Sequence, residues 1–193
     1  GEVWMEGRKL NIRHPSDAIR NGIAMVTEDR KEYGLVLCRS IRENMTLAHL
    51  PLSGGSPVLS KSAEIKRIQD MTSSINIKMS SLEQLAQNLS GGNQQKVVLS
   101  KWLMVKPKLL ILDEPTRGID IGAKAEIYRL ISTLAKEGMA IILISSELPE
   151  VLGMSDRILV MGNGKIKGEF SGGTATQEQI LACAIGGEDI VQR

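Results

Sequence analysis

A serine followed by two glycines, at the start of an amphipathic run, is the strongest chemical signal in the sequence. It lies in Leu89-Ser90-Gly91-Gly92-Asn93-Gln94-Gln95-Lys96. The first backbone amides of a helix have no partner inside it, and the helix dipole adds partial positive charge, so such a start can receive an anion. Glycines let a phosphate or another backbone approach closely. The sequence therefore predicts an anion site at the start of this helix. The simpler interpretation makes Ser90 only a helix cap, worth about 1 kcal/mol.

Two acidic residues follow an apolar stretch further along the chain. Leu109–Leu112 predicts a buried strand, and Asp113 and Glu114 come directly after it. Ligands bind at the carboxyl ends of strands in open α/β sheets. An aspartate there can hold Mg²⁺ on a nucleotide, and the next acid can orient or deprotonate an attacking water. Such pairs also occur at solvated strand ends, but together with the serine-glycine helix start they indicate phosphate chemistry. The 193 residues contain no G-x-x-x-x-G-K-[ST] phosphate-binding loop.

Apolar patterns predict the elements that position these residues. Gly1–Leu10 predicts a hairpin, and Asn163-Gly164 predicts another. The other strands read as continuous apolar runs, which indicates a parallel sheet covered on both faces. Further strands are predicted at Gly22–Val26, Leu109–Leu112, Ala140–Ile144, Arg157–Met161 and Lys165–Phe170, helices at Ser16–Arg20, Ile41–Leu47, Ala63–Ile68, Gly91 up to Pro107, Ile121–Leu134, Leu148–Leu152 and Thr176–Ile185, and a loop at Ser53–Pro57.

These elements predict one α/β domain over residues 1–193, with a mostly parallel sheet sandwiched by helices. We expect a helical subdomain at 33–106, which ends in the helix after Ser90. The α/β core then comprises 1–32 and 107–193 and carries a small antiparallel β element. The helix after Ser90 is expected to bury one apolar face, formed by Val98, Leu99, Trp102, Leu103 and Val105.

Composition excludes several classes of function. A net charge of +2 is too small to indicate a nucleic-acid partner. No apolar run is long enough to cross a bilayer. Cys38 and Cys183 lie far apart without metal-ligand spacing, which predicts reduced thiols. His14 and His49 are isolated and are expected to lie at the surface rather than bind a metal.

Three motifs in this order resemble those of ABC-transporter ATPase domains. Leu89–Lys96 resembles the signature motif, Leu109–Glu114 the Walker B strand, and Gly118–Asp120 the D-loop. Val26–Lys31, Thr116–Gly122 and Ser145–Glu150 look like the second ATPase half of bacterial monosaccharide importers of the xylose, ribose and galactose branch. The resemblance covers essentially the whole chain. It implies a P-loop NTPase fold whose first strand, Walker A loop and following helix would lie before Gly1.

The sequence departs from the family pattern at two further positions. Glu28 stands where the family has its Q-loop glutamine, and Ser146 where it has a switch histidine. A carboxylate at position 28 would face Mg²⁺ and phosphate with an added charge. Serine is too short and uncharged to replace an imidazole that reaches the terminal phosphate. By this resemblance the domain's own site, with Glu114 as the catalytic carboxylate that orients or deprotonates water and Asp113 on Mg²⁺, is expected to hydrolyse ATP poorly.

The resemblance implies a shared ATP site. Ser90 to Gln94 would contact ATP held by a second ATPase domain, fused or in trans, while Asp120 would help set that site's water or the dimer geometry. Transmembrane permease subunits, and indirectly a periplasmic or extracellular sugar-binding protein, are the expected partners of a peripheral protein on the cytoplasmic face of the membrane. Asp29–Lys31 and Arg39–Asn44 would dock the permease or form a solvated charged face. The isolated fragment is expected to be inactive. A different hypothesis is a catalytically silent assembly or regulatory module with little nucleotide binding.

Overall fold

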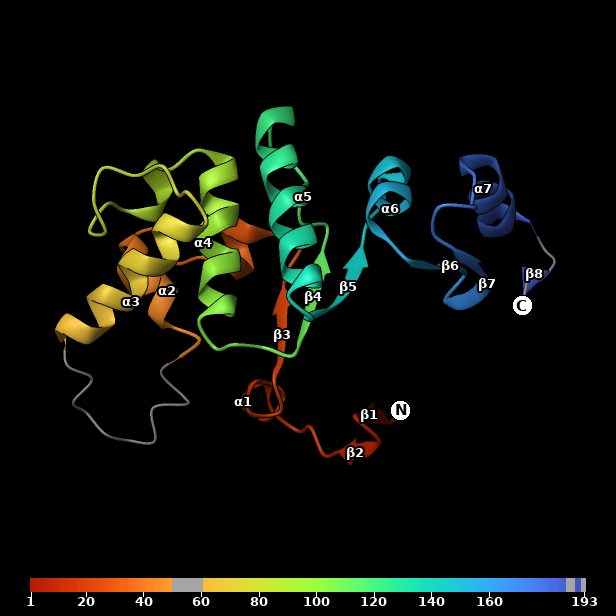
Figure 1. Cartoon of the computed structure of the whole chain (residues 1–193), viewed down its shortest axis with the longest axis horizontal. Helices are drawn as coiled ribbons and strands as arrows, with labels where there is room; N and C mark the ends of the chain where they lie inside the picture. Colours follow the sequence, from red (N-terminus) through yellow and green to blue (C-terminus); the bar gives the residue numbers. More distant parts are fainter. Residues whose placement is uncertain (50–60, 187–189, 192–193) are drawn as a thin grey trace. The chain divides into compact units, whose positions relative to one another are not determined.

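The computed structural model describes residues 1–49, 61–186 and 190–191, which fall into two compact units, Gly1–Ile142 and Leu143–Arg193 (Figure 1). The elements in chain order are β1 (Val3–Met5), β2 (Arg8–Leu10), α1 (Pro15–Arg20), β3 (Ile23–Val26), η1 (Arg30–Gly34), α2 (Ile41–Thr46), α3 (Lys61–Ser74), η3 (Ala86–Asn88), α4 (Gly91–Leu103), β4 (Leu109–Asp113), α5 (Ile121–Lys136), β5 (Ala140–Ile144), α6 (Leu148–Met154), β6 (Arg157–Gly162), β7 (Lys165–Ser171), α7 (Gln177–Ile185) and β8 (Ile190–Val191). These bounds confirm the predicted elements; the loop predicted at Ser53–Pro57 lies outside the described residues. Within the described ranges, no helix is long and apolar enough to span a membrane.

A parallel sheet forms the centre of the first unit. Its strand order is β3-β4-β5, and β3 pairs with β4 from Ile23 opposite Leu109 to Val26 opposite Leu112. Val26, Leu110 and Leu112 are completely buried. Burial nevertheless alternates along the three strands, and Met25, Ile142 and Ile144 are 40%, 48% and 46% exposed. Within the described residues, one face of the sheet is therefore better covered than the other, unlike the expected cover on both faces. The predicted α/β class with parallel strands and helices is confirmed. The division into a helical subdomain at 33–106 and an α/β core stays a prediction.

Helix α4 differs from its predicted amphipathic character. It lies beside α5 (Figure 1) and contacts α2, α3, η1 and β3 as well. Because neighbours surround it, its polar side chains are buried along with its apolar ones. Lys96, only 4% exposed, donates to the Asn76 carbonyl (2.8 Å) and pairs with Glu126 (2.5 Å). A buried charge is tolerated only when it is paired in this way.

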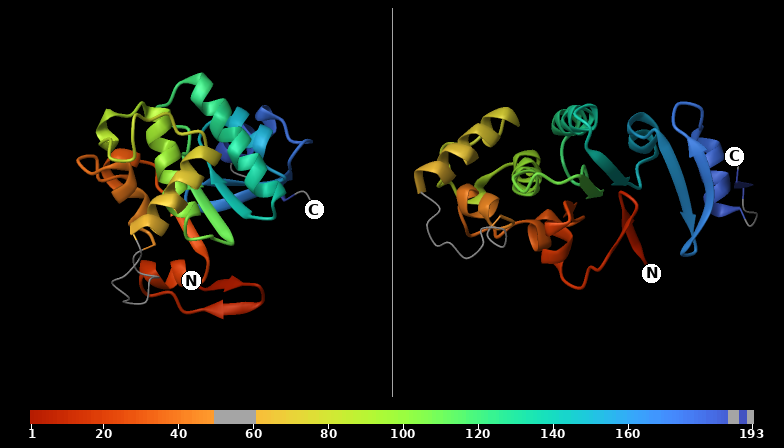
Figure 2. Two further views of the ribbon diagram at one scale, coloured as in Figure 1. Left: turned by 60° about the vertical axis from the view of Figure 1, so that its left-hand side comes forward. Right: turned by 60° about the horizontal axis from the view of Figure 1, so that its bottom comes forward.

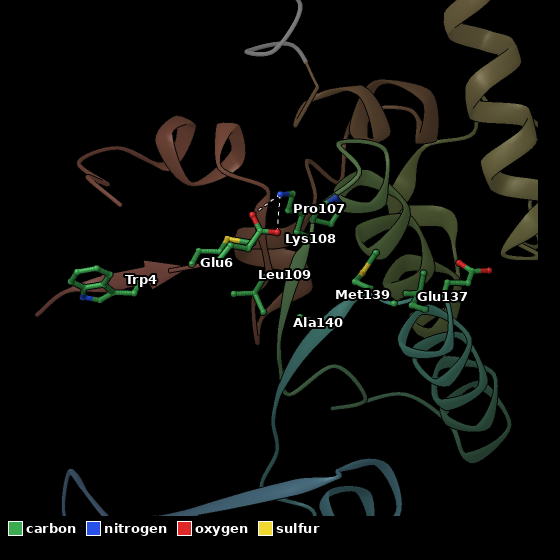
Figure 3. Close-up of a pocket in the computed structure, with 11 residues that line it drawn as sticks. Trp4, Glu6, Pro107, Lys108, Leu109, Glu137, Met139 and Ala140 are labelled. Atoms are coloured by element: carbon green, nitrogen blue, oxygen red, sulfur yellow. Dashed lines mark hydrogen bonds and ion pairs between the residues drawn. The ribbon is translucent and has the colours of Figure 1, made fainter. Parts of the chain in front are cut away.

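The hairpin β1–β2 lies at the same end of the first unit as α1 (Figure 2). Its turn residues Glu6 and Gly7 have φ of 50° and 75°, the left-handed backbone that a two-residue hairpin turn needs. Glu6 forms an ion pair with Lys108, just before β4 (2.8 Å), and the two residues line a pocket at the amino-terminal ends of β4 and β5 (Figure 3). None of the predicted site residues lines this pocket.

An antiparallel hairpin forms the second unit. Strands β6 and β7 pair through the predicted turn at Asn163-Gly164, and β8 adds in parallel to β7. Ile158, Val160 and Phe170 pack against Ile180 and Cys183 of α7. The expectation that Arg157–Met161 is covered on both faces is wrong, since its burial alternates. An antiparallel strand packs one face on a core and leaves the other outside.

Candidate functional site

The start of α4 presents Ser90 without using it as a cap. Ser90 is extended (φ −61°, ψ 156°) and exposed, and its side chain makes no capping hydrogen bond. The first bond back to the helix start runs from the Gln94 amide to the Ser90 carbonyl (2.9 Å). The amides of Gly91, Gly92 and Asn93 precede it and are those that a helix leaves without an internal acceptor. The geometry therefore does not support the simple cap interpretation and leaves the hydroxyl at the open end of the helix dipole.

Asn93 holds the Ser90 hydroxyl from within the chain. Its Nδ2 donates to Ser90 Oγ (2.9 Å), and its Oδ1 accepts from the Lys78 amide (2.8 Å). Because Ser90 Oγ already accepts this bond, the hydroxyl proton is the part of the group suited to an incoming acceptor. Gln94 is buried, and its Nε2 donates to the Ala86 carbonyl (3.1 Å), which ties the helix start to η3. Asn93 and Gln94 thus fix the position of Ser90.

The two glycines bring α4 against the segment that precedes and begins α5. A Cβ on Gly92 would lie 2.4 Å from the Cβ of Ala123, far inside van der Waals contact. A Cβ on Gly91 would lie 2.9 Å from Arg30 Nη2 and 3.4 Å from the Gly118 carbonyl oxygen. The glycines are therefore needed for helix packing as well as for access to the helix end.

Asp120 caps α5. Its Oδ1 accepts from the Ala123 amide (2.8 Å), which satisfies one of the open donors of that helix. The neighbouring Ile121 is 87% exposed, unusually high for a large apolar side chain. Ala123, in the same helix turn, approaches Gly92 closely, and this places Asp120 near the start of α4.

Asp113 and Glu114 stand at the carboxyl end of β4, as the sequence predicts. Asp113 is the last strand residue and Glu114 has φ 46°, a left-handed conformation that is costly for a residue with a side chain. The Arg117 amide donates to the Glu114 carbonyl (3.1 Å) and closes the turn. In the described part of the chain no three His, Cys, Asp or Glu side chains group into a metal site. Asp113 is partly buried at the end of β4, and its assignment to Mg²⁺ stays a prediction.

Glu28 is paired rather than left as a free carboxylate. It lies beyond the end of β3 and forms an ion pair with Arg117. The side chains are 49% and 66% exposed, so the pair contributes little to stability by itself. Its consequence is geometric, because it ties the segment after β3 to the segment after β4.

Ser146 belongs to the second unit. It is exposed beyond the end of β5. The preceding residue, Ser145, donates its hydroxyl to the buried carboxylate of Glu150 and accepts from the Glu147 amide (3.0 Å). These local bonds shape the turn from β5 into α6. In the first unit, Glu28 is joined to Arg117 after β4, and Gly91 and Gly92 lie against the segment that contains Asp120, while Ser146 belongs to the second unit.

Sequence reasoning placed Arg30 in a docking segment or a solvated charged face and missed its internal contacts, and it missed Lys101. Arg30 donates to two backbone carbonyls after β4, and Lys101 donates from α4 to the Gly34 carbonyl at the end of η1 (2.6 Å). Burial lowers the pKa of Lys101 to about 8, because an ammonium loses hydration there. The glycine that follows Arg117 is the only sequence signal for the first contact. No sequence signal indicates the contact between Lys101 and the Gly34 carbonyl, since a lysine on a helix usually faces water.

Comparison with solved structures shows the class of fold to which the chain belongs. A nucleotide-free ATP-binding cassette from an ABC transporter matches with a TM-score of 0.76 at 21% identity, over 95% of this chain and 72% of that one. A dimeric post-hydrolysis cassette bound to ADP and Pi matches with a TM-score of 0.74 at 20% identity, over 89% and 73%. At these identities the likeness establishes the fold, which is that of an ATP-binding cassette.

Sequence comparison gives the family. Residues 1–117 match the model of the ABC transporter family, and the chain belongs to that family. The Xylose import ATP-binding protein XylG of Geobacillus kaustophilus is 55% identical over 188 residues. The Ribose import ATP-binding protein RbsA of Bacillus cereus is 54% identical over 188 residues. The alignments cover 97% of this chain but only 37% and 38% of those relatives, so the chain spans little more than a third of their length.

Proposed function

We propose that the chain is part of the ATP-binding subunit of a bacterial monosaccharide ABC importer and contributes its signature motif to an ATP site held mainly by a second ATPase domain. Relatives above half identity that are named for xylose and ribose import support the substrate class. A cassette with the same fold that is dimeric with ADP and Pi supports the second domain. The identity of the sugar stays open within this class.

One observation carries the proposal: the Ser90 hydroxyl lies uncapped and exposed at the start of a 13-residue helix, positioned by Asn93. A cap-only serine would direct Oγ to an amide of its own helix. Here the side chain, the open amides and the helix dipole all suit a phosphate oxygen. The arrangement is therefore that of an anion-binding helix start.

The residues divide the work as follows. The Ser90 hydroxyl donates a hydrogen bond to an oxygen of the terminal phosphate of the ATP held by the second domain. The amides of Gly91 and Gly92 stabilise the negative charge that develops on this phosphate. Asn93 and Gln94 hold this helix start through their side chains. Mg²⁺, when bound with ATP, neutralises phosphate charge, and Asp113 is the residue we assign to it. Asp120 positions the D-loop next to the signature glycines.

The domain's own site is proposed to be the weaker of the two. Glu28 is engaged with Arg117, and Ser146 offers a short neutral hydroxyl where the family has an imidazole. Glu114 can still orient a water, but its contribution to hydrolysis is small without a glutamine at position 28 and a histidine at position 146. Hydrolysis would then depend on the other ATP site, which the second domain holds and Ser90 completes.

Permease subunits are the proposed mechanical partners, on the cytoplasmic face of the membrane, with a sugar-binding protein acting indirectly. Much of the predicted docking segment is engaged internally. Asp29 accepts from two amides of η1, Arg42 pairs with Glu83 (2.7 Å), and Asn44 is buried. Tyr33 and Val36 are among the exposed apolar side chains in the described part of this region, and a permease helix could cover them.

The 193-residue chain alone is expected to show no ATP hydrolysis and to bind Mg·ATP weakly, because it contains no lysine loop to hold the phosphates. Calorimetric titration with Mg·ATP and a phosphate-release assay measure both properties. A complete ATP-binding cassette is the positive control. Micromolar affinity, or turnover by this chain alone, would contradict a site that needs a second domain.

A further inference from the structure

The side chain of Arg30 connects two loops that leave neighbouring strands of the sheet. Arg30 comes from the segment after β3, and its Nη1 donates to the Arg117 carbonyl (2.8 Å) while its Nη2 donates to the Gly118 carbonyl (3.1 Å). Both acceptors belong to the segment after β4. One planar guanidinium thus holds two consecutive carbonyls, a geometry that a lysine ammonium reproduces poorly.

The backbone after β4 is shaped for this contact. Gly118 has φ 66°, which is left-handed and favours glycine. The neighbouring Arg117 side chain returns to Glu28, two residues before Arg30. Two sets of contacts therefore join the segments after β3 and β4. Arg30 donates to backbone carbonyls of the second segment, and Glu28 pairs with the Arg117 guanidinium.

The same guanidinium lies against the signature motif. A Cβ at Gly91 would approach Arg30 Nη2 to 2.9 Å, so the glycine leaves the space that this group fills. The Nε donor of Arg30 is also buried and has no hydrogen-bond partner among the residues described. A guanidinium with a desolvated donor depends strongly on the bonds that it does make. Arg30 is thus the side chain at which the segments after β3 and β4 and the start of α4 meet.

We propose that Arg30, supported by the Glu28–Arg117 pair, is a positioning residue that fixes the D-loop segment Arg117–Asp120 against the signature helix. Ser90 and Asp120 are then presented to a nucleotide as one rigid unit. The carboxylate at position 28 acts on Arg117 in this arrangement, rather than on a metal or phosphate. The effect on hydrolysis rests on the proposed function; the effect on the loop does not.

The test compares Arg30→Ala and Arg30→Lys in the protein at its natural length, with Arg129→Ala as the control. Arg129 is exposed on α5, so its loss removes the same charge without touching the loop. In Arg30→Ala, hydrogen exchange at the hydrogen-bonded amides of Arg117, Ala123 and Lys124 should become about tenfold faster, and kcat for ATP should fall about tenfold with little change in KM. Arg30→Lys should recover part of both, and Arg129→Ala should match the unmodified protein.

Two results would overturn the proposal. Unchanged exchange at the Arg117, Ala123 and Lys124 amides in Arg30→Ala would show that the loop holds its position without Arg30. Faster exchange with unchanged kcat would show that the loop's position does not matter for hydrolysis. In either case a strong loss of activity in Ser90→Arg would leave the proposed function standing, so the two failures are distinguishable.

Discussion

Replacing Ser90 by arginine in the protein at its natural length is expected to lower ATP hydrolysis by about two orders of magnitude. The hydroxyl stands exposed at the open end of α4, so the longer side chain fills the space that a terminal phosphate would occupy. It also removes the acceptor for Asn93 Nδ2, which is 2.9 Å away in the structure. The steady-state rate of phosphate release, measured at saturating Mg·ATP, gives the effect on kcat.

Ser73→Arg is the matched control for this substitution. Ser73 is exposed on α3 and takes no part in the hydrogen bonds of the Ser90 side chain, so the same change in size and charge should leave hydrolysis within about twofold. Unchanged ATP hydrolysis in Ser90→Arg would refute the proposal that the signature motif completes an ATP site held by a second domain. It would favour the hypothesis of a catalytically silent assembly or regulatory module.

The second large effect is expected from Gly92→Ala in the 193-residue chain. An alanine is a better helix former than glycine by about 1 kcal/mol, so the change would stabilise a helix in open space. At position 92, however, the new Cβ would lie 2.4 Å from the Cβ of Ala123. The starts of α4 and α5 must then separate, and we expect a net loss of about 1–3 kcal/mol in the free energy of unfolding. Urea unfolding measures it.

A complementary exchange tests the cause of this loss. Ala123→Gly removes the atom that the new Cβ meets, so the double variant Gly92→Ala with Ala123→Gly should regain most of the lost stability. Ala125→Gly lies in the same turn of α5 and costs similar helix propensity without relieving the contact. Equal stabilities of the two double variants would show that the close approach of Gly92 and Ala123 does not cause the loss.

Local sequence patterns predict most of the elements because their causes are local. The hairpin at Asn163-Gly164 follows from the left-handed conformation that both residues tolerate (φ 52° and 73°). The strand Leu109–Asp113 follows from an uninterrupted apolar run with acids after it. The anion-binding character of the Ser90 helix start follows from helix geometry and could be predicted without neighbours.

Contacts between distant segments could not be predicted in this way. The burial of Lys96 and Lys101 on α4 depends on which helices surround it, and a 3.6-residue period cannot report that. The Glu28–Arg117 pair joins two loops that meet only because β3 and β4 are neighbours. The alternating burial of β6 depends on which elements cover its two faces, which its apolar run conceals. Such features are set by topology rather than by local composition.

The central claim, that this chain's signature serves a site held by another domain, is tested most directly by comparing Glu114→Gln with Ser90→Arg in the protein at its natural length. Both residues belong to the first unit, but they are assigned to different ATP sites. ATP hydrolysis is measured for each variant at saturating Mg·ATP. The account predicts a loss of about two orders of magnitude for Ser90→Arg and a change within about threefold for Glu114→Gln. Equal, large losses from both substitutions would show that the domain's own site is active and would contradict the asymmetric arrangement.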